Sequence, residues 1–561
     1  MVNRCNNLKH MTNNELLYVT KDNAEWWRSA VIYQIYPRSF ADGNGDGMGD
    51  LQGITSRLEY IASLGVDAIW LSPFYPSPQV DAGYDVSDYC DVDPQFGTLA
   101  QFDELLRRAH ELGLKVTIDI VPNHCSNQHP WFVEAVAAGR GSAARSRFHF
   151  VDGRGENGDE PPSNWGSVFG GPSWTRVTEP DGSPGQWYYH LFAAEQPDFN
   201  WDNPEVLAEF ERIFSFWLDR GVDGFRIDVS DALIKDTTWP DTEGRWPIIP
   251  KDADSPVHDV YRALRTLMDR YDGDRMAVVE TGAPDDVVAL FIRNDEMHLA
   301  FNFRFVKAQW SATDFKAAID ESLAANAEVQ APTTWVIENH DVTRAVTRYG
   351  SNQRLEGSYI PGVEQVATVD IELGQRRARA AAVMLLSLPG AAYIYNGQEL
   401  GLPNVDDLPV DVIQDPSFAR TNGEVRGRDG CRIPLPWTTS GAALGFSSNP
   451  QTWLPIPAYY GDYAVALEQA DPTSMLSLYT RLLHIRRENA VLRRGELKWL
   501  EAPANVLRYE LSNAFDSVEV WVNFGDTPVG LPDGLEVIVA STQAGAAQLA
   551  VDSAAICRKT A

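Results

Sequence analysis

Acidic side chains follow apolar runs at four separate points of this 561-residue sequence. Asp119, Asp228, Glu280 and Asp341 each lie at or just beyond the end of such a run. A single carboxylate in that position could simply cap the helix that follows it. Four carboxylates at one edge of a sheet would repel each other and lose hydration, which a fold tolerates mainly where the acids do chemistry. We therefore expect these acids to form a catalytic site.

Eight apolar runs are predicted to be the strands that position these acids. Helix-like segments lie between them, for example Leu99–Leu112, Val206–Arg220 and Arg376–Ser387. Alternating strands and helices predict a parallel sheet, either closed into a barrel or doubly wound and open. Eight such units in one run favour the closed (β/α)₈ TIM barrel, whose active site lies at the carboxyl ends of the strands. The predicted strands are Val31–Tyr36, Ala68–Leu71, Lys115–Val121, Gly224–Asp228, Met276–Glu280, Leu299–Phe303, Thr334–Ile337 and Ala391–Tyr395.

Two long stretches interrupt this alternation. Residues 124–195 show no helical periodicity and are rich in Gly, Pro, Ser and Trp, and residues 396–472 are similar. Long excursions at the ends of barrel strands usually build the active site. The predicted organisation is an N-terminal extension at 1–24, a catalytic barrel at 25–123 and 196–490, an inserted subdomain B at 124–195 after the third strand, and a small C-terminal β domain at 491–561.

The composition is that of a globular and strongly acidic protein. Hydrophobic residues make up 44% and charged residues 22%, and the formal net charge is −31. Such a surface repels nucleic acids and anionic lipids, and it suits a neutral substrate. The five cysteines are scattered and show neither zinc-site nor disulfide-framework spacing. Because no signal-peptide pattern and no membrane-length apolar run is present, we expect a cytoplasmic protein.

Sequence motifs around the acids resemble the α-amylase family of glycoside hydrolases, family 13. These motifs are DIVPNH at 119–124, GFRID at 224–228, the strand-end Glu280 and ENHD at 338–341. Three further segments resemble the α-glucosidase and oligo-1,6-glucosidase branch of that family: VIYQIYPRSF at 31–40, GYDVSDY at 83–89 and QPDFNW at 196–201. The resemblance extends from about Trp26 to Trp437.

The resemblance implies a retaining mechanism. Asp228 would attack the anomeric carbon, and Glu280 would protonate the leaving oxygen and then activate water, with the two carboxyls about 5–5.5 Å apart. Asp341 would bind sugar hydroxyls and favour the distorted ring. Arg226 lies two residues before Asp228, on the same strand face. We expect its charge to keep Asp228 ionised, and we expect Glu280 to hold a proton in less cationic and less solvated surroundings.

The same resemblance implies a pocket for one glucose unit. Asp81 and Arg432 look like a polar clamp at its far end, and Tyr84 would stack beneath the sugar ring, because an aromatic face suits the C–H face of a sugar. His124 and His340 would donate hydrogen bonds to the sugar hydroxyls. A pocket closed in this way would release single glucose units and would not cut within a chain.

The predicted function is therefore an exo-acting α-glucosidase for short, maltose-type oligosaccharides, with α-1,4 bonds favoured and no organic cofactor. The alternatives are an oligo-1,6-glucosidase and a glucosyl-transferring or isomerising relative such as trehalose synthase, since these would use the same three acids. Val229 leans towards α-1,6 bonds by the same resemblance. Thr281 and Gly282 replace a usually bulkier pair after the acid, and their size suits several leaving sugars.

An acidic loop near the start of the chain forms a second candidate site. Its oxygen-bearing side chains recur with the spacing of the first half of an EF-hand loop. The bidentate Glu of an EF-hand is replaced by Gly53, and no preceding helix is expected, so the loop is not an EF-hand. A plain turn is the alternative. The resembling branch binds a divalent ion here, so we expect structural Ca²⁺ at Asp42, Asn44, Asp46, Met48 and Asp50.

Overall fold

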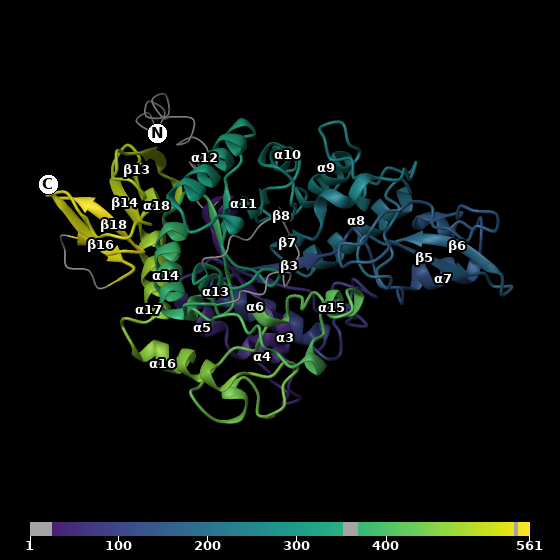
Figure 1. Ribbon diagram of the computed structural model, residues 1–561, viewed down its shortest axis with the longest axis horizontal. Coiled ribbons are helices and arrows are strands. Elements are labelled where there is room, and N and C mark those ends of the chain that lie inside the picture. The colour runs from purple at the N-terminus through teal and green to yellow at the C-terminus, as the bar shows by residue number, and fades with distance from the viewer. Residues whose placement is uncertain (1–24, 352–367, 543–547, 561) are drawn as a thin grey trace.

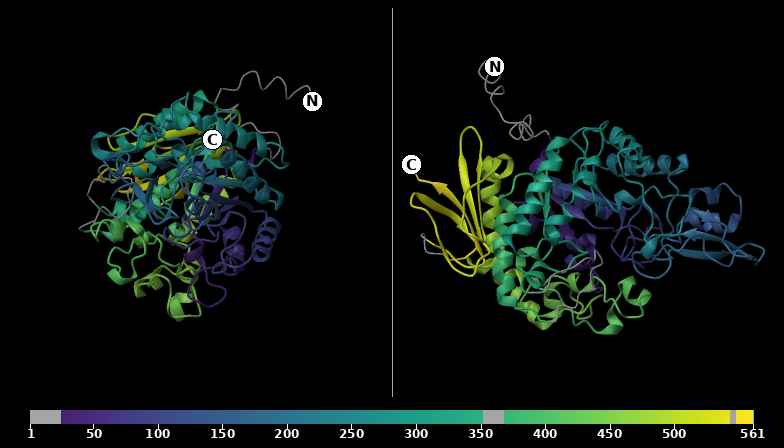
Figure 2. Two further views of the ribbon diagram at one scale, coloured as in Figure 1. Left: turned by 90° about the vertical axis from the view of Figure 1, so that its right-hand side faces the viewer. Right: turned by 45° about the horizontal axis from the view of Figure 1, so that its top comes forward.

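The computed structural model describes residues 25–351, 368–542 and 548–560. A C-terminal antiparallel sheet, a central barrel and an inserted sheet follow one another along the long axis of the molecule (Figure 1). The tilted view in Figure 2 shows the same order, with the yellow C-terminal sheet and the blue insert at opposite ends. The predicted extension at 1–24 lies outside the described residues.

Eight parallel strands form the central sheet, in the order β10-β11-β1-β2-β3-β7-β8-β9. Most of their residues are apolar, and almost all are buried. A parallel bridge between Phe301 and Thr334 joins the two ends of this order, so the sheet closes on itself. The predicted (β/α)₈ barrel is therefore confirmed. Its strands are β1 (Val31–Ile35), β2 (Ala68–Leu71), β3 (Lys115–Ile120), β7 (Gly224–Ile227), β8 (Met276–Val279), β9 (Leu299–Ala300), β10 (Thr334–Val336) and β11 (Ala391–Tyr395).

Polar caps and apolar faces explain the longer helices around the barrel. Thr98 caps α6 by accepting a hydrogen bond from the Gln101 N–H. Asp370 caps α14, which therefore begins five positions before the predicted Arg376. The described helices are α3 (Pro37–Phe40), α4 (Leu51–Ser56), α5 (Leu58–Leu64), α6 (Leu99–Glu111), α7 (Pro130–Ala138), α8 (Pro204–Asp219), α9 (Val257–Met268), α10 (Asp285–Leu290), α11 (Phe303–Lys307), α12 (Ala312–Glu328), α13 (Ala345–Tyr349), α14 (Ile371–Ser387), α15 (Pro416–Arg420), α16 (Val465–Ala470), α17 (Met475–Glu488) and α18 (Ala490–Arg494).

The insert after β3 contains more regular structure than the sequence predicted. Strands β4 (Phe150–Val151), β5 (Trp174–Thr178) and β6 (Pro184–Tyr189) form a sheet in the order β4-β6-β5. Helix α7 also lies within 124–195, so the expectation of no helix there was wrong. The reason is that α7 is apolar nearly all round, which leaves no polar face to reveal its period. The short helices α15 and α16 likewise lie within 396–472.

The C-terminal sheet packs against the barrel helices. Trp310 and Arg377 both donate hydrogen bonds to Asp552 Oδ1, at 2.6 and 2.9 Å. Arg379 Nε donates to the Ser541 carbonyl at 2.7 Å. These bonds fix the sheet on the α14 side of the barrel. The larger sheet has the order β12-β13-β14-β18-β16, and its strands together with the pair β15 and β17 are β12 (Glu496–Trp499), β13 (Val506–Ser512), β14 (Ser517–Asn523), β15 (Val529–Gly530), β16 (Leu535–Ala540), β17 (Gln548–Leu549) and β18 (Ser553–Lys559).

The described part of the chain contains four cysteines, and all are free thiols. Cys90 is half-buried, whereas the other three are buried. None of the described helices is both long enough and apolar enough to cross a membrane.

Candidate active site

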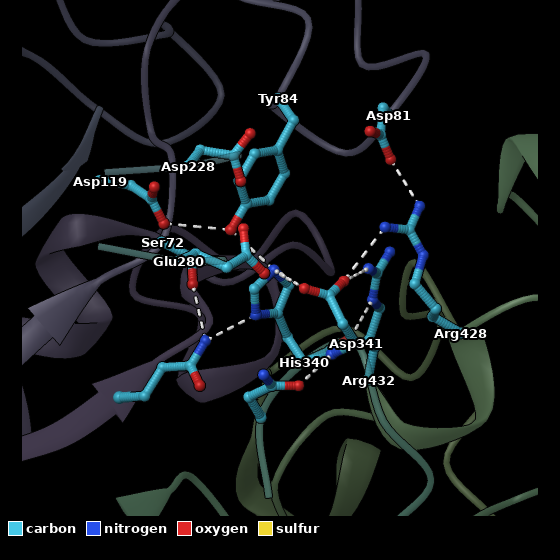
Figure 3. A network of polar contacts seen from close by, with 12 residues as sticks. Ser72, Asp81, Tyr84, Asp119, Asp228, Glu280, His340, Asp341, Arg428 and Arg432 are labelled. Atoms are coloured by element: carbon cyan, nitrogen blue, oxygen red, sulfur yellow. Dashed lines mark hydrogen bonds and ion pairs between the residues drawn. The ribbon is translucent and has the colours of Figure 1, made fainter. Parts of the chain in front are cut away.

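Strand register brings three of the predicted acids to one edge of the barrel. β3, β7 and β8 are neighbours, and Asp119 pairs in register with Arg226. The ladder continues just past the strand ends, because Asp228 N–H donates to the Ile120 carbonyl and Glu280 N–H donates to the Ile227 carbonyl. Asp119, Asp228 and Glu280 therefore lie side by side, as Figure 3 shows.

The guanidinium of Arg226 holds these three carboxylates together. Its Nη1 lies 2.9 Å from Asp119 Oδ1 and 2.5 Å from Asp228 Oδ1. Its Nη2 lies 2.6 Å from Glu280 Oε2. All four side chains are at least nine-tenths buried. Three carboxylates and one guanidinium in a buried space leave two negative charges to be relieved by protons or by substrate.

Burial dominates the protonation of this cluster. Burial raises the pKa of Asp119 to about 7, with Arg226 opposing the shift. Burial also raises the pKa of Asp228 well above its usual range, and Arg226 again opposes it. Arg226 acts on Asp228 in the expected direction, but burial opposes it and the one guanidinium is shared by three acids. The expectation that Glu280 has less cationic surroundings was wrong, since it contacts Arg226. The cluster therefore shares protons, as coupled carboxylates do.

The chain turns sharply after Asp228. Val229 has φ 44° and ψ 46°, the left-handed region, where a β-branched residue is strained by about 1–3 kcal/mol. The turn is fixed by bonds to the acid: Val229 N–H donates to Glu280 Oε2 at 3.2 Å and Ser230 N–H donates to the Glu280 carbonyl at 2.9 Å. The backbone after Asp228 is thus tied to Glu280, which fixes the two catalytic carboxyls relative to each other.

Asp341 lies at the opposite end of the site, beside two guanidiniums and a histidine. Arg428 Nη1, Arg432 Nη2 and His340 Nε2 each lie 3.1 Å from its carboxylate oxygens (Figure 3). Burial raises the pKa of Asp341, but His340, Arg428 and Arg432 together outweigh burial and hold this pKa below its usual range. Asp341 is therefore ionised at neutral pH.

The ion-pair partner of Asp81 is Arg428, whereas Arg432, the predicted second member of the clamp, contacts Asp341. Arg428 Nη2 lies 2.6 Å from Asp81 Oδ1, and its Nε lies 2.5 Å from Asp415 Oδ2. Arg432 instead donates from Nε to the His340 carbonyl at 2.8 Å and contacts Asp341. Both arginines belong to the loop at 427–434, but the turn at Asp429–Cys431 places Arg428 beside Asp81.

Tyr84 and His340 form a parallel stack behind the acids, with ring centroids 5.3 Å apart and ring planes 3° apart. Tyr84 Oη lies 3.1 Å from Asp119 Oδ2 and 2.7 Å from His340 Nε2. The other ring nitrogen of His340 lies 2.8 Å from Gln34 Nε2. Burial lowers the pKa of His340 well below its usual range, so it is neutral. Because both ring nitrogens are engaged, His340 positions Tyr84 and Asp341, and the expected hydrogen bonds to sugar are not available in this arrangement.

A cavity that opens to solvent lies between the two groups of charges. His124 lines the cavity and is neutral, because burial lowers its pKa to about 4. The insert contributes an apolar wall that the sequence did not reveal. The lining residues are Asp81, Tyr84, His124, Val168, Phe169, Phe192, Asp228, Val229, Glu280, Asp341, Ser417 and Arg428.

Comparison with known proteins assigns the family. Residues 34–495 match the catalytic domain of alpha amylase. The chain belongs to the alpha-amylase family. It is therefore a glycoside hydrolase, and the predicted resemblance is confirmed. The match begins within β1 and covers the other seven barrel strands and the insert between β3 and β7.

Three similar proteins place the chain among the α-glucosidases of the alpha-amylase family. A probable alpha-glucosidase of Rhizobium meliloti is 37% identical over 90% of each chain. An oligo-1,6-glucosidase of Parageobacillus thermoglucosidasius is 34% identical over 91% of this chain and 92% of the relative. The crystal structure of an alpha-glucosyl transfer enzyme superposes with a TM-score of 0.81, at 36% identity, over 95% of this chain and 99% of that one.

In the acidic loop, carboxylates accept hydrogen bonds from nearby backbone N–H groups. Asp42 accepts hydrogen bonds from the Gly45 and Gly47 N–H groups, and Asp50 caps α4 through the Gly53 N–H. Contrary to expectation, a short helix, α3, precedes the loop. Among the described residues, no Lys or Arg forms an ion pair with the three acids, and no cluster of three or more acidic, His or Cys side chains has the form of a metal site. The oxygen donors and uncompensated charge fit a hard cation such as Ca²⁺.

Several contacts of the site could not be found from the sequence. Asp119 was recognised as a strand-end acid, but only the β3–β7 register shows that it meets Arg226. Arg428 lies in the same loop as the predicted Arg432, four positions before it. Phe169 and Phe192 come from the insert, where only the length of the excursion signalled a role.

Proposed function

We propose that this glycoside hydrolase removes single glucose units from the non-reducing end of short α-glucosides, with α-1,4 bonds favoured. The observation that carries the proposal is the ion-pair bridge of Arg428 to Asp81 and Asp341, 2.6 and 3.1 Å long, beside the cavity. A bridge at that place would block longer chains and leave room for one terminal sugar. The names of the α-glucosidase and oligo-1,6-glucosidase relatives support the same class of substrate.

The proposed chemistry is a double displacement with retention. Asp228 attacks the anomeric carbon while Glu280 gives its proton to the leaving oxygen, which forms a glucosyl ester and frees the leaving sugar. Glu280, now ionised, takes a proton from water, and the resulting nucleophile displaces Asp228. Arg226 contacts both carboxyls, so it can follow the negative charge from one to the other. Asp341 remains ionised and can stabilise the positive charge of the transition state.

We propose that the enzyme accepts more than one type of α-glucosidic linkage. A side-chain atom added at Gly282 would meet nothing within 4 Å, so the loop after the acid leaves space for several leaving sugars. Discrimination between similar leaving groups is typically about 1–3 kcal/mol per small change in a subsite. Glucosyl transfer is the second candidate, because the similar solved structure is of an alpha-glucosyl transfer enzyme and transfer uses the same ester intermediate.

One assay tests the proposal. Maltose, isomaltose, sucrose and trehalose are supplied separately, and the fresh products are followed by NMR. We expect maltose to be hydrolysed and glucose to appear first as the α-anomer. Initial β-glucose would contradict the double displacement. Activity on isomaltose with none on maltose would contradict the linkage, and transferred products in excess of free glucose would favour the second candidate.

We also propose that the acidic loop holds structural Ca²⁺ through Asp42, Asn44, Asp46, the Met48 carbonyl and Asp50. The oxygen donors, and three carboxylates that no described Lys or Arg neutralises, support this proposal. The ion would stabilise the loop beside α4 and take no part in the reaction. We include no organic cofactor in the mechanism, because the three acids supply the proton and the nucleophile.

A further inference from the structure

The two excursions that build the cavity meet at a short helix. α15 (Pro416–Arg420) belongs to the excursion after β11, and the turn it touches, residues 169–172, belongs to the insert after β3. Arg420 Nε donates to the Gly170 carbonyl at 3.0 Å, and Arg420 Nη2 donates to the Pro172 carbonyl at 3.1 Å. One guanidinium thus joins segments that lie about 250 residues apart in the sequence.

The turn held by Arg420 requires support from outside. Gly170 and Gly171 both have positive φ, 90° and 74°, so two successive residues adopt the left-handed region. A side-chain atom added at Gly170 would lie 3.0 Å from Thr421 Cγ2, which shows how closely the turn approaches the end of α15. Glycine has a large conformational freedom to lose, so a turn of this kind is held mainly by its contacts.

The turn matters to the cavity because Phe169 immediately precedes it. Phe169 lines the cavity, and its ring lies 5.1 Å from the guanidinium carbon of Arg428. Arg428 in turn bridges Asp81 and Asp341. A displaced turn would therefore move the aromatic face that supports the clamp for the terminal sugar.

The other end of α15 returns to the same arginine. Asp415 caps α15 by accepting a hydrogen bond from the Ser417 N–H at 2.9 Å, and its second oxygen contacts Arg428 Nε at 2.5 Å. The contacts form a closed circuit from Arg428 through Asp415, α15 and Arg420 to the turn, and through Phe169 back to Arg428. α15 thus bridges the two walls of the cavity.

We propose that Arg420 is a positioning residue that sets the width of the glucose end of the cavity. It touches neither the sugar nor the reacting atoms, and it acts through the turn and Phe169 on Arg428. The inference rests on the proposed function, because it assumes that the clamp binds the terminal glucose. The clamp binds the terminal glucose equally strongly in the ground state and in the transition state. Loss of Arg420 should therefore raise KM and leave kcat nearly constant.

The test compares two arginines that make the same bonds in different places. Arg176 also donates to two backbone carbonyls, from Nε to Gly185 at 2.9 Å and from Nη2 to Asn157 at 2.8 Å, but it lies within the insert and outside the circuit. In Arg420→Ala we expect KM for maltose and the inhibition constant of glucose to rise together about fivefold to twentyfold, with kcat changed less than about threefold. In Arg176→Ala we expect both constants to stay at the wild-type values.

Three outcomes would overturn the proposal: unchanged constants in Arg420→Ala, equal effects in the two alanine variants, or a loss confined to kcat. Arg420→Lys keeps a cation that can reach one carbonyl, so an intermediate KM is expected. If Arg420→Ala does not fold, wild-type constants in Arg420→Lys overturn the proposal. Wild-type turnover of maltose is measured first; if another α-glucoside is cleaved instead, the proposed linkage fails, and the same ratios are measured on that substrate.

Discussion

The two ends of the active site have similar burial and opposite electrostatics. Among the described residues, the reactive end has three carboxylates around the single guanidinium of Arg226, whereas the binding end has Asp81, Asp341 and Asp415 against two guanidiniums. Burial raises the pKa of Asp228 but is outweighed at Asp341, whose pKa falls. The additional guanidinium at the binding end therefore accounts for the lower pKa of Asp341 compared with that of Asp228. A proton is needed where a bond breaks, and fixed charge is needed where a sugar is held.

The acidic loop extends this comparison to a third case. Asp42, Asp46 and Asp50 have no guanidinium or ammonium partner within the described residues, although Asp50 is buried. Burial raises the pKa of Asp50, and hydrogen bonds from the Gly53 and Gly43 N–H groups oppose this shift. Where no basic side chain compensates the acids, an external cation is the remaining source of positive charge.

The largest expected effect is loss of the nucleophile at the reactive end. Asp228→Ala should reduce turnover of maltose by at least about a hundredfold, because no other group can form the ester. Turnover is measured with purified protein, and circular dichroism and melting curves check that the fold is intact. A residual rate above about a hundredth of the wild-type rate would show that Asp228 is not the nucleophile.

Removal of the Glu280 carboxyl should slow substrates with poor leaving groups more than substrates with good ones. Glu280→Ala should slow maltose hydrolysis by about 10²–10⁴-fold, the usual contribution of a general acid. An aryl glucoside with a good leaving group needs little protonation, so the first step on it should be slowed much less. Burst kinetics with the aryl glucoside provide the measurement. An equal loss on both substrates would contradict the assignment of Glu280.

Matched substitutions should change stability in opposite directions at the two ends. The pKa of Asp228 is raised on folding, so its contribution to stability is present at low pH and is lost as the pH rises through that pKa. Asp228→Asn should therefore raise the melting temperature, and increasingly so at higher pH. The pKa of Asp341 is lowered, so its contribution is present above the ordinary pKa and is lost as the pH falls through the lowered value.

Asp341→Asn should consequently lower the melting temperature at neutral pH, because it removes the carboxylate that pairs with the buried Arg432, a loss of about 3–5 kcal/mol. This loss of stability should become smaller below about pH 4, where Asp341 becomes protonated in the unfolded state. Melting curves at about pH 3, pH 5 and pH 8 measure both variants. Shifts of the same sign at both ends would refute the comparison between them.

The smallest expected effect concerns the acidic loop. A chelator should lower the melting temperature by a few degrees and change activity at low temperature less, because a bound ion stabilises the folded state by mass action. Adding Ca²⁺ back should restore the transition, and Asp46→Asn should weaken the response. Identical melting curves with and without chelator would count against the ion.

The strands and the strand-end positions of Asp228 and Glu280 could be predicted from the sequence, because buried parallel strands leave long apolar runs and end in the acids. The internal structure of the insert could not, since α7 lacks a polar face and the sheet of the insert is built from short strands with mixed burial. The sequence also could not show whether Arg428 or Arg432 contacts Asp81. Both belong to one loop, and a single turn at Asp429–Cys431 decides which of them reaches Asp81. Shared use of Arg226 by three acids depends on strand register, which no local pattern reveals.

The bridge formed by α15 has a consequence for the exchange of segments between relatives. Substrate choice is often altered by replacing a loop domain, and the insert at 124–195 is an obvious unit for such a replacement. Here the insert is bonded to Arg420 in a segment that follows the last barrel strand. A chimaera that receives the insert alone would lose its partner for the Gly170–Pro172 turn. The insert and the segment from Asp415 to Arg428 should therefore be exchanged together, although they are far apart in the sequence.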